Sequence, residues 1–187
     1  VYDTAMFAGV IALAWALFVI LREVDRNHAL LGLLWRMAEA VVGAVTVLLG
    51  VLIVLLVESQ GVRAAFEPAQ LHSLVGVLVT ARGIGFDVTI FFLSLGTIVN
   101  CRLLYRSRYV PRVLAGLGVA SFALMLVGTV VSLLLPRYRD LAMAAWAPGI
   151  VFEVAIGAWL LLKGVRTPGP PAPGHGAPAP AAAASRG

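Results

Sequence analysis

Apolar residues fall into five long runs along this chain, and short polar stretches separate the runs. An α-helix rises about 1.5 Å per residue, so about 20 apolar residues cross the roughly 30 Å hydrocarbon core of a bilayer. The runs cover residues 5–21, 29–57, 83–104, 113–135 and 141–162. They lack the two-residue alternation of membrane barrel strands, and unpaired strand edges are not tolerated in lipid. The pattern predicts an all-α, polytopic transmembrane bundle of five helices over residues 1–166.

The connection at residues 58–82 is the longest between the predicted helices. Its apolar stretch, residues 70–80, is too short to span a bilayer. We expect this stretch either to lie on the outer membrane surface or to extend the third helix outward. Residues 167–187 are almost wholly Pro, Ala and Gly, and this composition predicts a disordered tail because it cannot bury a core.

Composition excludes a water-soluble domain. Hydrophobic residues make up 61% of the chain and charged residues 12%, and the mean hydropathy is +0.98. An average soluble domain has about twice that share of charged residues. The single cysteine excludes an internal disulfide and any metal or redox motif built on paired cysteines. The lipid bilayer is therefore the expected partner of this surface.

The basic residues are distributed unevenly between the two ends of the predicted helices. Nine lie at one end: Arg22, Arg26, Arg36, Arg102, Arg106, Arg108, Arg112, Lys163 and Arg166. Four lie at the other end: Arg63, Arg82, Arg137 and Arg139. Because the end richer in Lys and Arg faces the cytoplasm, we expect an inner (plasma) membrane protein with a cytoplasmic C-terminus. No basic face of a solvated domain accompanies the net charge of +5, so nucleic acid is not an expected partner.

Glu153 is the most informative polar residue. It precedes Lys163 by ten residues, which places it near the expected bilayer midplane. A carboxylate at this depth costs at least about 2.5–3.5 kcal/mol, so it should face protein or a wet cavity, or carry a proton. Pro148 is expected to kink the same helix and to free backbone carbonyls nearby. Glu153 is either an ion, proton or ligand contact or a structural hydrogen-bond partner between helices.

Arg36 and Glu39 are three residues apart, so they share one helix face and can pair. If the second span is residues 40–57, Arg36 is an interfacial anchor and Glu39 reaches water. If the span begins near Leu31, both side chains are buried at a depth close to that of Glu153. Arg36 would then lie between the two carboxylates. This second alternative predicts that the second and fifth helices pack together.

Asp87 and Asn100 complete the candidates for a ligand or ion network, which are Arg36, Glu39, Glu153, Asp87 and Asn100. Interfacial solvation is the simplest expectation for Asp87 at the outer end of its helix. Asn100 is more typical of a hydrogen-bonding contact between helices than of a ligand. His28 and His72 lie outside the expected core on opposite sides, so a bis-histidine haem is not expected. The sequence offers no catalytic set or metal-ligand pattern, and no cofactor is expected.

Three motifs together resemble a bacterial multi-pass membrane family catalogued as domain-of-unknown-function family 4386. They are Arg36-x-x-Glu39-Ala40; Phe91-Phe92 followed by Leu103-Leu104-Tyr105-Arg106-Ser107 and Pro111-Arg112-Val113-Leu114; and Glu153 followed by Trp159-Leu160-Leu161-x-Lys163-Gly164. The resemblance covers about residues 3–164 and implies a fold but no reaction. Family members usually have one more N-terminal helix, so we expect an upstream helix that this chain lacks. Gly96 stands where members often have a histidine.

Three classes of function remain open. The first is a non-enzymatic bundle that binds a lipid, a small molecule or a protein partner. The second is a small transporter or proton-coupled permease using Glu153 with Arg36 and Glu39, where a homo-oligomer supplies the missing repeat. The third, an intramembrane enzyme, needs a nucleophile–base pair that the predicted bundle does not offer. A water-sized cavity reaching Glu153 would favour transport, whereas a closed apolar core would favour a structural role.

Overall fold

The computed structural model describes residues 2–164, with side chains from residue 5 onward, and this part of the chain is all-α. Its elements are α1 (Tyr2–Leu21), α2 (Arg26–Glu58), α3 (Gln60–Ala65), α4 (Pro68–Ser107), α5 (Arg112–Leu134), the 3₁₀ turn η1 (Pro136–Tyr138), α6 (Arg139–Ala144) and α7 (Ala147–Lys163). The predicted tail at residues 167–187 lies outside the described residues.

The prediction of an all-α transmembrane bundle is confirmed, with a small difference in the number of spans. Four segments of the described chain are long and apolar enough to cross a membrane: residues 26–58, 68–107, 112–134 and 136–163. The apolar part of α1, Ala5–Leu21, is shorter than these spans. The five predicted apolar helices are therefore present in order, and four of them have the full length of a span.

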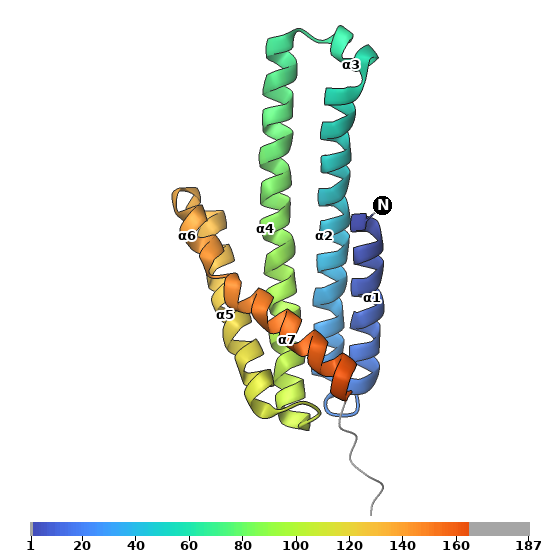
Figure 1. The fold of residues 1–187 in the computed structure, drawn as a ribbon, viewed down its shortest axis with the longest axis vertical. Coiled ribbons are helices and arrows are strands. Elements are labelled where there is room, and N and C mark those ends of the chain that lie inside the picture. The colour runs from blue at the N-terminus through green and yellow to red at the C-terminus, as the bar shows by residue number, and fades with distance from the viewer. Residues whose placement is uncertain (1, 165–187) are drawn as a thin grey trace, which may run out of the picture.

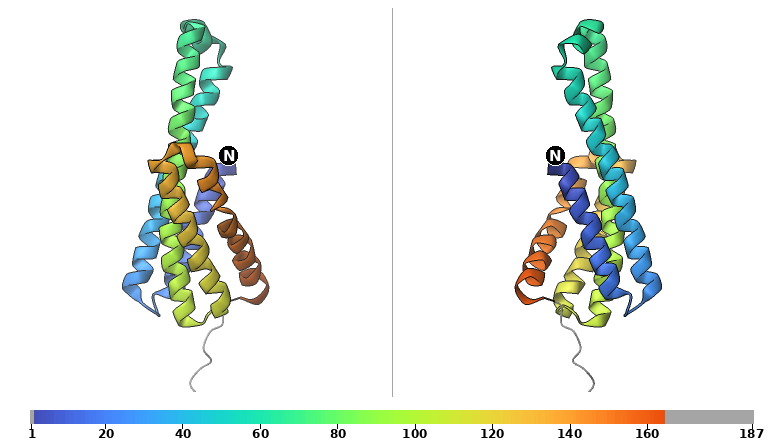
Figure 2. Two further views of the ribbon diagram at one scale, coloured as in Figure 1. Left: turned by 90° about the vertical axis from the view of Figure 1, so that its left-hand side faces the viewer. Right: turned by 90° about the vertical axis from the view of Figure 1, so that its right-hand side faces the viewer.

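A long antiparallel hairpin of α2 and α4 forms the centre of the molecule (Figure 1). The two helices have 33 and 40 residues, and α3 connects them. Figures 1 and 2 show that this hairpin extends beyond the other helices. Residues 70–80 belong to α4, so of the two alternatives the structure has the one in which this stretch extends the third helix. Pro68 begins α4, where its missing N–H group breaks no helical hydrogen bond.

The remaining helices pack on the hairpin unequally. The helix α1 lies along α2, and α5 lies along α4 on the other side. The helix α7 packs on α5 and crosses the lower part of the hairpin at a distance (Figures 1 and 2). The prediction that the second and fifth apolar helices pack together is wrong, because α7 is packed on α5 rather than on α2.

Pro148 interrupts the fifth apolar run more strongly than the expected kink. The helix α6 ends at Ala144, and α7 begins at Ala147 with Pro148 in its first turn. A proline clashes with the carbonyl four residues earlier when it lies inside a helix, whereas it fits the first turn without loss. The break reorients α7, so that Phe152 contacts Phe122 of α5 edge to face, with ring centroids 5.9 Å apart.

Candidate functional site

A cavity of about 740 Å³ lies between α1, α2, α4 and α7. It exists because α7 is held by α5 and does not close against α2. Most of its lining is apolar, with Phe7, Leu17 and Leu93 among the contributing side chains. Four of the five candidate residues from the sequence also line it: Arg36, Glu39, Asn100 and Glu153. The cavity therefore combines an apolar space with a small polar patch.

The polar patch centres on an ion pair within α2. Nη1 of Arg36 lies 2.8 Å from Oε2 of Glu39, and the exposed fractions of the two residues are 8% and 5%. The pair forms because residues three apart share a helix face. This burial agrees with the alternative in which the second membrane segment begins before Arg36. Oε2 of Glu39 is buried, and Nη1 of Arg36 is its charged neighbour among the described residues.

Gly96 of α4 provides the space for the Arg36 side chain. A Cβ atom at residue 96 would lie 3.0 Å from Cδ of Arg36 and 3.3 Å from Cβ of Trp35. Both distances are below ordinary van der Waals contact. The space beside residue 96 is therefore filled by the arginine stem.

Glu153 faces the same cavity from α7. Arg36 and Glu153 are close enough for their charges to interact, but they form no direct ion pair in the described part of the chain. Of the two ion pairs expected for Arg36, the structure therefore contains the one with Glu39 and not the one with Glu153. The lateral distance between α2 and α7 is the reason, since the two helices lie on opposite walls of the cavity.

Asn100 lies in the contact between α2 and α4. Its side-chain oxygen packs directly against Gly32, where there is no room for a Cβ atom. The residue is 7% exposed and reaches the cavity lining. Asn100 therefore lies between helices as expected, but it contacts Gly32 by packing and not by the expected hydrogen bond.

Asp87 belongs to a separate polar cluster, and its expected interfacial solvation is wrong. The residue is 1% exposed. It accepts a hydrogen bond from the Ser132 hydroxyl at 3.0 Å and one from Nη2 of Arg139 at 3.0 Å. Arg139 also donates to the Gly83 carbonyl at 3.3 Å. The cluster connects α4, α5 and α6, which explains why a buried carboxylate is tolerated there.

Sequence reasoning missed Ser132, Arg139 and Gly96 as partners of the candidate residues. Arg139 entered only as one of the four basic residues at the outer end. The pairing of Asp87 with Arg139 spans 52 positions, so local spacing carries no signal for it. A weak signal existed for Ser132, because it continues a stripe of small residues on the fourth apolar run.

A third polar cluster lies outside the membrane-spanning segments, at the start of α2. The Asp25 carboxylate caps α2 by accepting the His28 backbone N–H at 3.1 Å, and His28 Nδ1 lies 2.8 Å from Oδ2. The backbone hydrogen bond from His28 holds the pKa of Asp25 below its usual value. Nη1 of Arg106, at the end of α4, lies 3.6 Å from the same carboxylate. The cluster therefore joins the two helices of the hairpin at this end.

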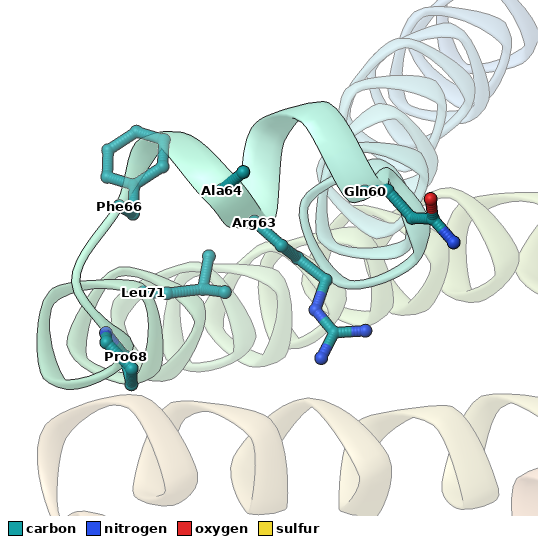
Figure 3. Close-up of a pocket in the computed structure, with 6 residues that line it drawn as sticks. All are labelled: Gln60, Arg63, Ala64, Phe66, Pro68 and Leu71. Carbon is teal, nitrogen blue, oxygen red and sulfur yellow. The ribbon is translucent and has the colours of Figure 1, made fainter.

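A further pocket and a search for metal ligands give no additional candidate site in the described residues. A pocket of about 340 Å³ at the tip of the hairpin is lined by Gln60, Arg63, Ala64, Phe66, Pro68 and Leu71 (Figure 3). Its one charged lining residue is Arg63. Between residues 5 and 164, no group of three His, Cys, Asp or Glu side chains is placed to hold a metal ion.

Comparison with known proteins identifies the family. The model of a family described as Domain of unknown function (DUF4386) matches residues 1–164. A search of the curated proteins finds no match, and neither does a search of the solved structures. The matched region contains α1 to α7 and every candidate residue above. The described residues contain several candidate membrane spans, as expected of a membrane protein. The chain therefore belongs to the DUF4386 family.

Proposed function

We propose that this protein is a non-enzymatic membrane protein that binds an amphiphilic small molecule in the cavity between α1, α2, α4 and α7. The observation that carries the proposal is that two carboxylates face one cavity from opposite walls, with a single guanidinium, that of Arg36, in the polar patch. Oε2 of Glu39 is paired with Arg36, and Glu153 forms no ion pair among the described residues. Glu39 is 5% exposed, whereas the Glu153 side chain is exposed beside the cavity. A carboxylate without a counter-charge within a membrane span is costly unless a donor reaches it.

The shape and charge of the cavity define the class of molecule. A volume of about 740 Å³ lies within the usual range of small-molecule sites, about 300–1,000 Å³. Arg36, Glu39 and Glu153 together carry one excess negative charge, so a cationic or hydrogen-bond-donating group suits this patch. Arg82 also lines the cavity, but it lies over Gly50, about 16 Å along α2 from Glu39. The apolar side chains around it suit an alkyl chain or ring system. A long-chain amine has both properties.

The experiment compares three ligands of equal chain length on the purified full chain in detergent. Thermal unfolding is measured with an alkylamine, the corresponding alcohol and the corresponding fatty acid. We expect the amine to raise the midpoint most and the acid least, because only the amine is complementary to the excess negative charge. Glu153→Gln should reduce the preference for the amine over the alcohol. An equal shift from amine and acid in the unmodified protein would contradict the proposal.

A cavity-filling variant provides a test that leaves the charges unchanged. Gly157 lines the cavity, and a Cβ atom there has no neighbour within 4 Å. Gly157→Leu should therefore fold normally and weaken binding of every ligand that enters the cavity. Gly9→Leu is the matched control, because residue 9 is equally open but does not line the cavity. Equal effects of the two substitutions would argue against binding at this place.

Proton-coupled transport is the second candidate, and one observation favours it. A cavity that reaches Glu153 is expected of a transporter and not of a closed structural core, and Glu153 lines this cavity. In proteoliposomes with an imposed pH gradient, a transporter would move the bound amine, and Glu153→Gln would uncouple this movement from the gradient. Binding without any gradient-driven uptake would leave the non-enzymatic binding function.

A further inference from the structure

A second hollow lies between α2 and α4, beside α6. It is a groove of about 780 Å³ whose walls are formed largely by apolar residues, among them Val47, Val51, Val54, Leu55 and Val79. Several of these side chains are about half exposed. The charged residues of the groove are Arg82 and Arg139. The groove thus combines apolar walls with two guanidinium groups.

Both guanidinium groups lie over glycines. A Cβ atom at Gly50 would be 3.0 Å from Nε of Arg82, and one at Gly83 would be 3.6 Å from Nη2 of Arg139. The lack of side chains at these two glycines lets the arginines lie against the backbones of α2 and α4. Arg139 is also fixed by its hydrogen bonds to Asp87 and to the Gly83 carbonyl.

The charges in the groove are not balanced. Asp87 pairs with Arg139 at 3.0 Å, whereas Arg82 forms no ion pair among residues 5–164. No Asp or Glu lines the groove itself. One positive charge therefore remains over apolar walls, which is the reverse of the excess negative charge in the patch of Arg36, Glu39 and Glu153.

We propose that this groove binds a phospholipid with an anionic headgroup, with the phosphate between Arg82 and Arg139 and an acyl chain along α2. Guanidinium groups are well suited to phosphate oxygens because their planar N–H donors form two parallel hydrogen bonds. The acyl chain contacts Val51, Val54 and Leu55. This site goes beyond the proposed cavity function, since it takes a ligand of the opposite charge. Arg82 lines both hollows, whereas Arg139 and the residues that contact the acyl chain line the groove and not the cavity.

Native mass spectrometry of the purified full chain tests the proposal. The protein is titrated with phosphatidylglycerol, with phosphatidylcholine of the same acyl chains and with inorganic phosphate. We expect phosphatidylglycerol to bind about tenfold more tightly than phosphatidylcholine, because the choline ammonium offsets the phosphate charge of phosphatidylcholine. Arg82→Gln should remove this preference. Arg137→Gln is the matched control, because Arg137 is an exposed neighbour that does not line the groove.

A second variant keeps both positive charges. Gly50→Ala introduces a Cβ atom against the Arg82 side chain and should move the guanidinium, so it should also reduce the preference. Gly157→Leu should leave the preference unchanged, which separates this site from the cavity. Equal binding of the two phospholipids, or equal losses in Arg82→Gln and Arg137→Gln, would overturn the proposal. Inorganic phosphate binding as tightly as phosphatidylglycerol would show a phosphate site and overturn the assignment to lipid.

Discussion

Replacing Arg139 by leucine tests the cluster that joins α4, α5 and α6 around Asp87. Arg139 provides the counter-charge of Asp87 at 3.0 Å. After the substitution, the Asp87 carboxylate keeps the Ser132 hydroxyl as its donor. Asp87 is 1% exposed, so water does not replace the lost guanidinium. We expect the free energy of unfolding to fall.

The magnitude follows from the exposure of the two partners. Removing one member of a fully buried ion pair costs about 3–5 kcal/mol. The Arg139 side chain is 36% exposed, so solvent already screens part of the interaction. We therefore expect Arg139→Leu to cost about 2–3 kcal/mol. Ser132→Ala removes one hydrogen bond within the membrane and should cost about 1 kcal/mol.

The assay is unfolding of the purified protein in mixed micelles by titration with sodium dodecyl sulfate, followed by loss of helicity. Arg137→Leu serves as the control, because Arg137 lies close by but packs on Tyr138 rather than on Asp87. The double variant Asp87→Leu with Arg139→Leu should be more stable than Arg139→Leu, since no buried charge is left without a partner. Equal stability of Arg139→Leu and Arg137→Leu would refute the reasoning.

Three further predictions concern other parts of the chain. Gly96→His should lower the free energy of unfolding by about 1–3 kcal/mol, because its Cβ meets Arg36 and Trp35, and a more stable variant in the same assay would contradict this. The depressed pKa of Asp25 stabilises the fold above the unfolded value, about 4, and this stability is lost as pH falls through the folded value. Between about pH 3 and 5, the midpoint of thermal unfolding should therefore change less with pH in Asp25→Asn than in the unmodified protein. Identical pH profiles would count against the cap. Reporter fusions after Arg112 and after Gly187 should both read cytoplasmic, and an external reading at either would reverse the proposed orientation.

The helices of the fold were predictable because the bilayer limits the choices. A span needs about 20 apolar residues, so the run around Phe122 predicts one helix with little ambiguity. Pro148 marked a disturbance of the fifth run, and its place in the first turn of α7 agrees with the geometry of proline. The apolar stretch at residues 70–80 had two interpretations, and only packing along α2 selects the extension of α4.

The arrangement of the site was less predictable because sequence gives depth but no lateral position. Helical rise placed Arg36 and Glu153 at similar depths, and both do line one cavity. The same arithmetic could not show that α7 packs on α5, which keeps the two charges from direct contact. Asp87 was misjudged for the same reason, since its partner Arg139 lies on another helix and becomes a neighbour only in the folded bundle.

The Arg36–Glu39 and Asp87–Arg139 ion pairs differ in when they can form during biosynthesis. Arg36 and Glu39 belong to one helical turn, so they can neutralise each other as soon as α2 has folded, before any later helix exists. The membrane-insertion machinery then receives a paired segment instead of two isolated charges, each of which would cost about 2.5–3.5 kcal/mol at the bilayer centre. Asp87 has no such neighbour on α4, and Arg139 is synthesised 52 residues later. Charge neutralisation in α2 thus needs no later helix, whereas Asp87 lacks its counter-charge until the ribosome has completed α5 and α6.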